Sequence, residues 1–131
     1  MVALLADRPD VWDAVASGDL TAPEVVEEVM RLRGAATHVG RTVVEPIEVD
    51  GERLEPGTPV LFSLSSANRD EAVFPRPETL APRENADVPH VGFGHGPHVC
   101  LGAALARAEL QEALSALSAR INCPAVGSRV R

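Results

Sequence analysis

The chain has 131 residues, of which 45% are hydrophobic, 24% are charged and only 3% are aromatic. A chain of this length forms one domain at most, and its core must be built from Ala, Val and Leu because aromatic side chains are scarce. The net charge of −7 disfavours nucleic-acid binding, which depends on Lys and Arg to neutralise phosphates.

Apolar runs in the sequence are short, whereas a transmembrane helix needs about 20 consecutive apolar residues, so no membrane span is predicted. The first residues lack the basic leader and the cleavage site of a signal peptide. The two cysteines, Cys100 and Cys123, are too few for a disulfide framework, although a single bridge between them is an alternative. A reducing, cytoplasmic location is therefore expected.

In the N-terminal region, residues 1–33, a first segment over 1–17 is predicted to be helical with an interruption near Pro9. A break at Ser17-Gly18-Asp19 separates it from a second helix. Thr21 and Glu24 have the spacing of a capping box, in which each side chain accepts a hydrogen bond from the other residue's backbone N–H. They mark the start of the second helix, and Gly34 can end it in a left-handed cap.

Residues 41–64 are predicted to form a small β region. Asp50-Gly51 is typical of a two-residue hairpin turn, and Pro56-Gly57 indicates a second turn. Three short segments around these turns are rich in β-forming residues: Thr42-Val43-Val44, Ile47-Glu48-Val49 and Val60-Leu61-Phe62.

Residues 65–92 are predicted to be an irregular loop, because prolines recur along it, and long ordered loops are often functional. A final helix is predicted over residues 101–121 from an apolar stripe at helical spacing: Ala106, Leu110, Ala113, Leu114, Leu117 and Ile121. Together these elements predict a single domain that is mainly α with a small β-sheet, an α+β fold.

The segment between loop and helix, residues 93–102, has the sequence FGHGPHVCLG. Gly94 and Gly96 allow a positive φ, so the chain can turn tightly here. Cys100 is then expected at the N-terminus of the final helix, where free N–H groups and the helix dipole favour a thiolate. A thiolate is a ligand for a metal.

Two neighbours of Cys100 indicate what kind of group it could bind. Gly102 leaves no side chain between the helix and a flat partner, and His98 can donate a hydrogen bond to an anion. A flat, anionic, iron-bearing group suits this arrangement. Two alternatives are a buried structural thiol and a simple metal site, the latter built from His90, His95, His98 and Cys100.

The segment resembles the haem-binding signature of the cytochrome P-450 family, F-x-x-G-x-x-x-C-x-G, through Phe93, Gly96, Cys100 and Gly102. The resemblance runs from near residue 1 to about Ile121 and implies the C-terminal portion of the P-450 fold. Further matches are the E-x-x-R motif Glu28-Val29-Met30-Arg31, the loop residues Asn68-Arg69-Asp70 and Phe74-Pro75, and the bacterial-type continuation Ala104-Leu105-Ala106-Arg107.

The resemblance implies a haem-thiolate monooxygenase that binds haem b. Cys100 would be the axial thiolate and the catalytic ligand, His98 and Arg41 would contact the haem propionates, and Phe93 would shield the sulfur. For Arg41 an ordinary solvated charge on a strand is an alternative. The glycines of the same loop would complete the haem-binding set: Gly94, Gly96 and Gly102.

The E-x-x-R motif implies a buried structural pair between Glu28 and Arg31, although residues three apart on a helix can also form a surface ion pair. The chain departs from the family in two places. Thr79 stands where an Arg is usual in the loop before the haem segment, and Gly34 stands where a proline is common. The pair is therefore expected to lack its usual third charge.

The same resemblance implies that the family's N-terminal part, with the helix over the distal haem face, lies outside this sequence. The leading hypothesis is a haem-thiolate monooxygenase that is active in a longer form or with a complementing N-terminal chain. Its electrons would come from a redox partner such as a ferredoxin. The alternative is a non-catalytic remnant or an auxiliary, partner-binding protein. Cys100 favours the first hypothesis, and Thr79 favours the second.

Overall fold

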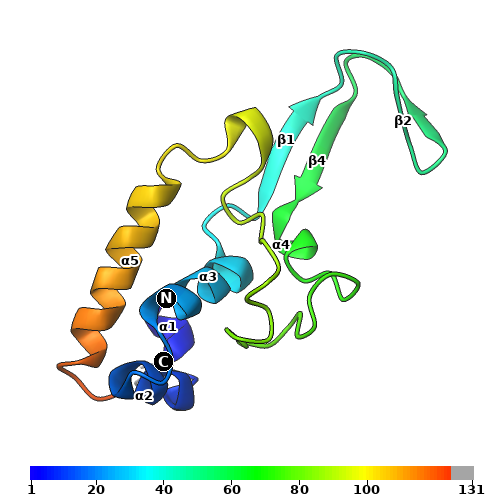
Figure 1. The fold of residues 1–131 in the computed structure, drawn as a ribbon. Helices are drawn as coiled ribbons and strands as arrows, with labels where there is room; N and C mark the ends of the chain where they lie inside the picture. The colour runs from blue at the N-terminus through cyan, green and yellow to red at the C-terminus, as the bar shows by residue number, and fades with distance from the viewer. Residues whose placement is uncertain (125–131) are drawn as a thin grey trace, which may run out of the picture.

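The computed structural model describes residues 1–124. Four helices, α1 (Val2–Leu5), α2 (Pro9–Ser17), α3 (Ala22–Arg33) and α5 (Ala103–Ser118), form the helical body shown in Figure 1. Two small antiparallel sheets of two strands each extend away from this body. The prediction of a mainly helical fold with a small β component is confirmed.

Helix α3 lies at the centre of the core. Its N-terminus is the predicted capping box: the N–H of Thr21 donates to Glu24 Oε2 at 2.7 Å, and the N–H of Glu24 donates to Thr21 Oγ1 at 3.4 Å. The apolar face of α3 is buried against side chains from α1, α2 and α5, which include the fully enclosed Leu5, Trp12 and Leu114. This contact fixes α5 beside α3, and α5 directly follows residues 93–102, the cysteine loop.

The helix ends at Arg33, but the predicted left-handed cap at Gly34 is wrong. Gly34 has φ −56° and ψ 150°, which is an extended conformation open to any residue. A Cβ atom at Gly34 would lie 2.9 Å from the carbonyl oxygen of Met30 and 3.6 Å from the Cα of Gly92. Glycine is needed here because a Cβ atom would clash with the Met30 carbonyl in the last turn of α3 itself, whereas the distance to Gly92 is an ordinary van der Waals contact.

Strand β1 (His38–Thr42) pairs with β4 (Pro59–Ser63), and β2 (Ile47–Val49) pairs with β3 (Glu52–Leu54). The hairpin turn at Asp50-Gly51 is confirmed by positive φ values of 49° and 81°, and the turn at Pro56-Gly57 by the φ of 91° at its glycine.

The first strand lies nearer the N-terminus than predicted. Thr42 is its last residue, and Val43 and Val44 lie outside it. Val43 is instead held in the turn that precedes β4, where its carbonyl accepts from the N–H of Gly57 at 2.8 Å. The pairing partner β4, rather than local β propensity, sets these bounds.

The segment predicted as an irregular loop over 65–92 begins with a short helix, α4 (Leu64–Ala67). Its first turn is capped by the side chain of Ser63, which accepts from the N–H of Ser66 at 3.3 Å. The rest of the segment contains turns but no longer element. A short helix capped by serine was not recognised in the sequence because four residues carry no measurable periodicity.

The final helix begins later and ends earlier than the predicted range of 101–121. It spans Ala103–Ser118, so Cys100 precedes it in a turn closed by the Ala103 N–H on the Cys100 carbonyl at 3.2 Å. Only Leu114 and Ser118 of this helix are buried. Most of the predicted apolar stripe is therefore only partly covered.

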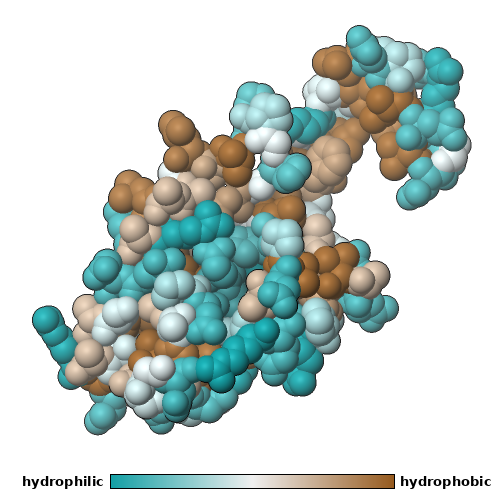
Figure 2. All heavy atoms as spheres, in the orientation of Figure 1, coloured by the Kyte–Doolittle hydropathy of each residue, from teal (hydrophilic) through white to brown (hydrophobic). Residues whose placement is uncertain are grey.

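Apolar atoms gather on the projecting strands and near the start of α5 (Figure 2). Leu101 is fully exposed, at 103% of its reference area. The other exposed large apolar side chains in these regions include Val44, Ile47, Val49, Leu61, Phe62, Val99 and Leu105. Within residues 1–124, no helix has the length and apolar character that crossing a membrane requires.

Candidate functional site

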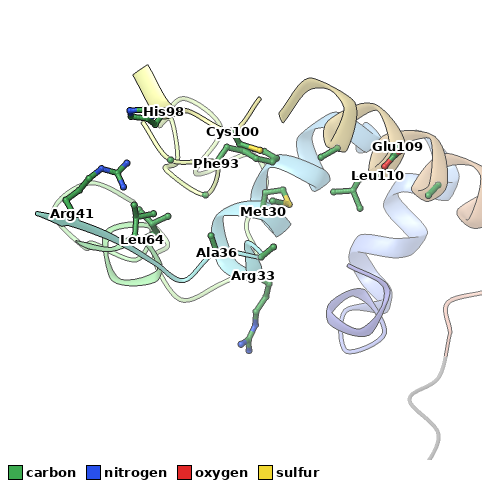
Figure 3. A pocket seen from close by; sticks show the side chains of 16 residues that line it. Met30, Arg33, Ala36, Arg41, Leu64, Phe93, His98, Cys100, Glu109 and Leu110 are labelled. Carbon is green, nitrogen blue, oxygen red and sulfur yellow. The ribbon is translucent and has the colours of Figure 1, made fainter. Parts of the chain in front are cut away.

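A cavity of about 1150 Å³ lies between the end of α3, strand β1, the cysteine loop and α5. Figure 3 shows the side chains that line it, with Cys100 and Phe93 between the strand side and the helix side. Its floor is apolar and includes Met30, Val39 and Leu110. The predicted site residues that line the cavity are Arg41, Phe93, Gly94, His98 and Cys100.

The cysteine loop is built by tight turns. Gly94 and Gly96 both have φ 77°, so the predicted use of positive φ is confirmed at each. The N–H of Gly94 donates to Val91 at 2.8 Å, and the N–H of Cys100 donates to the carbonyl of Phe93 at 2.9 Å. These bonds close the loop and present the exposed Cys100 thiol to the cavity.

Two of the predicted glycines, Gly96 and Gly102, lie outside the cavity lining in the described part of the chain. Gly96 begins the short 3₁₀ helix η1 (Gly96–His98), which carries His98 to the cavity. A Cβ atom at Gly102 would lie 4.0 Å from the sulfur of Cys100, an ordinary van der Waals contact. A Cβ atom would therefore fit beside the sulfur, and the polypeptide alone does not require glycine at this position.

Arg41 and His98 lie on the same side of the cavity, as Figure 3 shows, and the lining also contains two further charged residues, Arg33 and Glu109. Arg41 extends from β1, and its guanidinium donates to the neighbouring Gly40 carbonyl at 2.8 Å. Within residues 1–124, no carboxylate forms an ion pair with Arg41. A cationic edge beside an apolar floor suits a flat molecule that carries carboxylates.

Behind the cavity, Glu28 and Arg31 form a buried ion pair, with side chains only 4% and 2% exposed. Arg31 Nε and Nη2 donate to the two carboxylate oxygens of Glu28 at 2.7 and 2.8 Å. The alternative of a surface pair is therefore wrong. Arg31 also donates to backbone carbonyls of the loop that follows α4, those of Asn68, Arg76, Pro77 and Thr79.

Asn85 is the member of this network that the sequence did not reveal. Its Nδ2 donates to Glu28 Oε1 at 2.7 Å, and the N–H of Ala81 donates to the same oxygen at 2.9 Å. Thr79 contributes its carbonyl to Arg31 rather than a charge to Glu28. Neutral donors thus satisfy the carboxylate, and nothing in the sequence distinguishes Asn85 from an ordinary loop asparagine.

The disulfide and simple-metal alternatives each meet a structural objection. Both cysteines are free, and they lie beyond opposite ends of α5, whose 16 residues span about 24 Å. His90 has both ring nitrogens engaged, with Glu27 at 3.1 Å and with the N–H of Gly92 at 3.0 Å. In the described residues no three His, Cys, Asp or Glu side chains are grouped to hold a metal ion.

Comparison with known proteins shows which family this chain resembles. The family model described as Cytochrome P-450 matches residues 7–118. Among solved structures, that of the P-450 enzyme OxyD, involved in the biosynthesis of vancomycin-type antibiotics, matches with a TM-score of 0.91 and 39% identity. The match covers 98% of this chain and 33% of that one.

Two curated relatives have similar identity. Luteothin monooxygenase of Streptomyces thioluteus is 39% identical over 95% of this chain and 31% of its own length. Nocardicin C N-oxygenase of Nocardia uniformis subsp. tsuyamanensis is 43% identical over 91% of this chain and 30% of its own length. The chain thus spans about three-tenths of the length of these relatives.

Proposed function

Because the chain belongs to the cytochrome P-450 family, we propose that it is the haem-binding, C-terminal portion of a haem-thiolate monooxygenase, with Cys100 as the axial ligand of the iron. The observation that carries this proposal is the convergence of a thiol, two cationic or hydrogen-bonding side chains and an apolar floor around one cavity.

The residues of the cavity suit haem b. Cys100 is an exposed thiol, so its sulfur is accessible to an iron atom. Arg41 and His98 lie together on one side, where they can bind the two propionates of a porphyrin. Met30 and Leu110 belong to the apolar floor, against which the ring system can pack.

Each of these residues has a distinct part in the proposed activity. A thiolate ligand gives bound haem the electron density that favours O–O cleavage. Cys100 supplies that ligand, and Phe93, whose carbonyl accepts the Cys100 N–H, shields the sulfur once haem covers the cavity. Arg41 and His98 orient the porphyrin through its carboxylates. Glu28 and Arg31 hold the loop that leads into the cysteine segment.

The activity of the whole enzyme extends the proposal beyond this chain. Since the chain covers about three-tenths of its relatives' length, we propose that oxygen activation and substrate selection also need segments that those longer relatives contain. Electrons would come from a redox partner such as a ferredoxin, and the location would be cytoplasmic. We expect coupled oxygenation of a substrate only when a fragment with those segments is co-expressed.

Spectroscopy of the haem-reconstituted chain tests the ligand. Reduced and exposed to carbon monoxide, the parent chain should show the red-shifted Soret band of a thiolate ligand. Cys100→Ala should abolish that band, because no other thiol lines the cavity in the described residues. Cys123→Ala is the matched control and should leave the band intact. An unchanged spectrum in Cys100→Ala would overturn the proposal.

A further inference from the structure

Glu27, His90 and Arg107 come from three separate segments and meet beside the cysteine loop. Arg107 of α5 donates to Glu27 of α3 through Nε to Oε1 at 2.7 Å and through Nη2 to Oε2 at 2.9 Å. His90, in the loop before Phe93, lies with Nε2 3.1 Å from Glu27 Oε2. One carboxylate therefore ties α5 and this loop to α3.

The charge states of the three groups agree with these hydrogen bonds. Burial by itself would raise the pKa of Glu27, but the hydrogen bond and charge of Arg107, together with His90, lower it, so Glu27 is a carboxylate. Burial lowers the pKa of His90, which favours the neutral ring. The N–H of Gly92 donates to Nδ1 of His90, so the ring proton belongs on Nε2, from which it is donated to Glu27.

The aromatic ring of Phe93 lies against two of these side chains. The guanidinium carbon of Arg107 is 4.6 Å from the centre of the Phe93 ring, within the range of a cation–π interaction. The ring of His90 is 6.0 Å from the same ring, measured between centroids. Arg107 and His90 thus contact Phe93 while both are held by Glu27.

Phe93 connects this cluster to Cys100. Its carbonyl accepts the N–H of Cys100 at 2.9 Å, the hydrogen bond that closes the cysteine loop. Glu27, His90 and Arg107 do not belong to the cavity lining in the described part of the chain, whereas Phe93 and Cys100 do. The three residues reach the cysteine loop through the ring of Phe93 and through the hydrogen bond from the Gly92 N–H to His90.

We propose that Glu27, His90 and Arg107 are positioning residues that clamp Phe93 and, through its carbonyl, set the conformation of the Cys100 loop. The assignment of Cys100 as a haem ligand rests on the function proposed above, but the clamp is a property of the polypeptide. It holds the loop in place before haem binds, so that haem binding need not order the loop.

Amide hydrogen exchange in the haem-free chain tests the clamp. Arg107→Met keeps the length of the side chain and removes its charge and its donors. The Cys100 amide should then exchange about five to ten times faster than in the parent, because one cation–π contact and one ion pair are lost. Arg107→Lys keeps a charge beside Glu27 and should show a smaller acceleration. Arg120→Met, an exposed arginine beyond the same helix, should leave the rate unchanged.

The same variants in the haem-reconstituted chain give a spectroscopic reading of the sulfur. Under carbon monoxide, Arg107→Met should lower the fraction of haem with the thiolate-type Soret band. In Arg107→Lys this fraction should lie between those of the parent and of Arg107→Met. If the parent lacks that band, the proposed function fails while the exchange rates still decide the clamp. An Arg107→Met chain whose Cys100 amide exchanges at the parent rate would overturn the clamp, as would an equal acceleration in Arg120→Met.

Discussion

Helix α3 has two faces that differ in how nearby polar groups find hydrogen-bond partners: a closed face, which carries Glu28 and Arg31, and an open face, which carries Met30. On one face, Glu28 and Arg31 are enclosed by the loop that follows α4, and all their charges are paired or hydrogen-bonded. On the other, Met30 borders an open cavity of about 1150 Å³, whose edge carries the exposed Arg41 and the exposed Cys100.

The difference separates structural polar groups from candidate binding groups. A buried ion pair that is fully hydrogen-bonded is costly to disrupt, since removal of one partner leaves the other charge unpaired away from water. Polar groups at the edge of an open cavity can be changed at little cost to folding, because water solvates them. Substitutions on the closed face should therefore change stability, and those on the open face should change ligand binding.

The largest effect is expected from Glu28→Ala on the closed face. It leaves the guanidinium of Arg31 buried without its carboxylate, which should lower the free energy of unfolding by about 3–5 kcal/mol. Denaturant titration followed by circular dichroism measures the change. Glu112→Ala, an exposed glutamate on α5, is the control and should change stability by less than about 0.5 kcal/mol. Equal stabilities for the two variants would remove the distinction between the faces.

Asn85→Ala sharpens the same comparison, because it tests a neutral member of the closed network. The substitution removes one donor to Glu28 and the Oδ1 acceptor of the Arg76 N–H, and should cost about 1–3 kcal/mol. Asn122→Ala, at an exposed asparagine, serves as the control. If the two asparagine variants unfold at the same denaturant concentration, then Asn85 does not stand in for the missing third charge.

On the open face, Arg41→Ala should leave unfolding nearly unchanged and weaken haem retention. The loss of one charge-assisted hydrogen bond to a propionate corresponds to about a tenfold to hundredfold weaker affinity. Haem transfer to an apo-globin acceptor measures it. Arg53→Ala, in the exposed hairpin, is the matched control. If Arg41→Ala retains haem as well as the parent does, Arg41 is an ordinary solvated charge on a strand and does not bind a propionate.

The smallest effect concerns pH and His90, which is faced by Glu27 and Glu28 of α3 and by Arg107 of α5. Burial, only partly opposed by Glu27, lowers the pKa of His90 in the folded chain. The unfolded chain keeps an ordinary value of about 6.5 and so takes up a proton first as the pH falls. Stability attributable to His90 is therefore present above about pH 6.5 and is lost on acidification below it.

His90→Gln tests this linkage by removing the titrating ring. The slope of unfolding free energy against pH should become shallower between about pH 7 and pH 5. His38→Gln, at an exposed histidine, should keep the slope of the parent. Parallel curves for parent and His90→Gln would show that groups other than His90 set the pH dependence of the free energy of unfolding.

Elements whose conformation depends on neighbouring residues were predicted correctly from the sequence. The capping box at Thr21 and the hairpin turn at Asp50-Gly51 depend on neighbouring residues alone, and both predictions are confirmed. The cysteine loop was found for a similar reason, since its positive φ values at Gly94 and Gly96 follow from the glycines themselves. Its place at the cavity edge also agrees with the family resemblance.

Features set by distant contacts were not predicted. A Cβ atom at Gly92 would lie 2.8 Å from the carbonyl oxygen of Met30 on α3, and Asn85 acts on Glu28 across 57 positions. The start of α5 at Ala103 was also missed, because the turn that holds Cys100 depends on its bond to Phe93. None of these contacts leaves a periodic trace in the sequence.

The same long-range bonds have a kinetic consequence. The hydrogen bonds from Ala81 and Asn85 to Glu28 span 53 and 57 residues, whereas the capping box of α3 spans three. Closing a long loop has a larger entropic cost than closing a short one, so contacts of this kind form late in folding. Changes at Asn85 should thus accelerate unfolding and leave the folding rate nearly constant. The lifetime of the native state, more than the speed of reaching it, depends on the loop around Glu28.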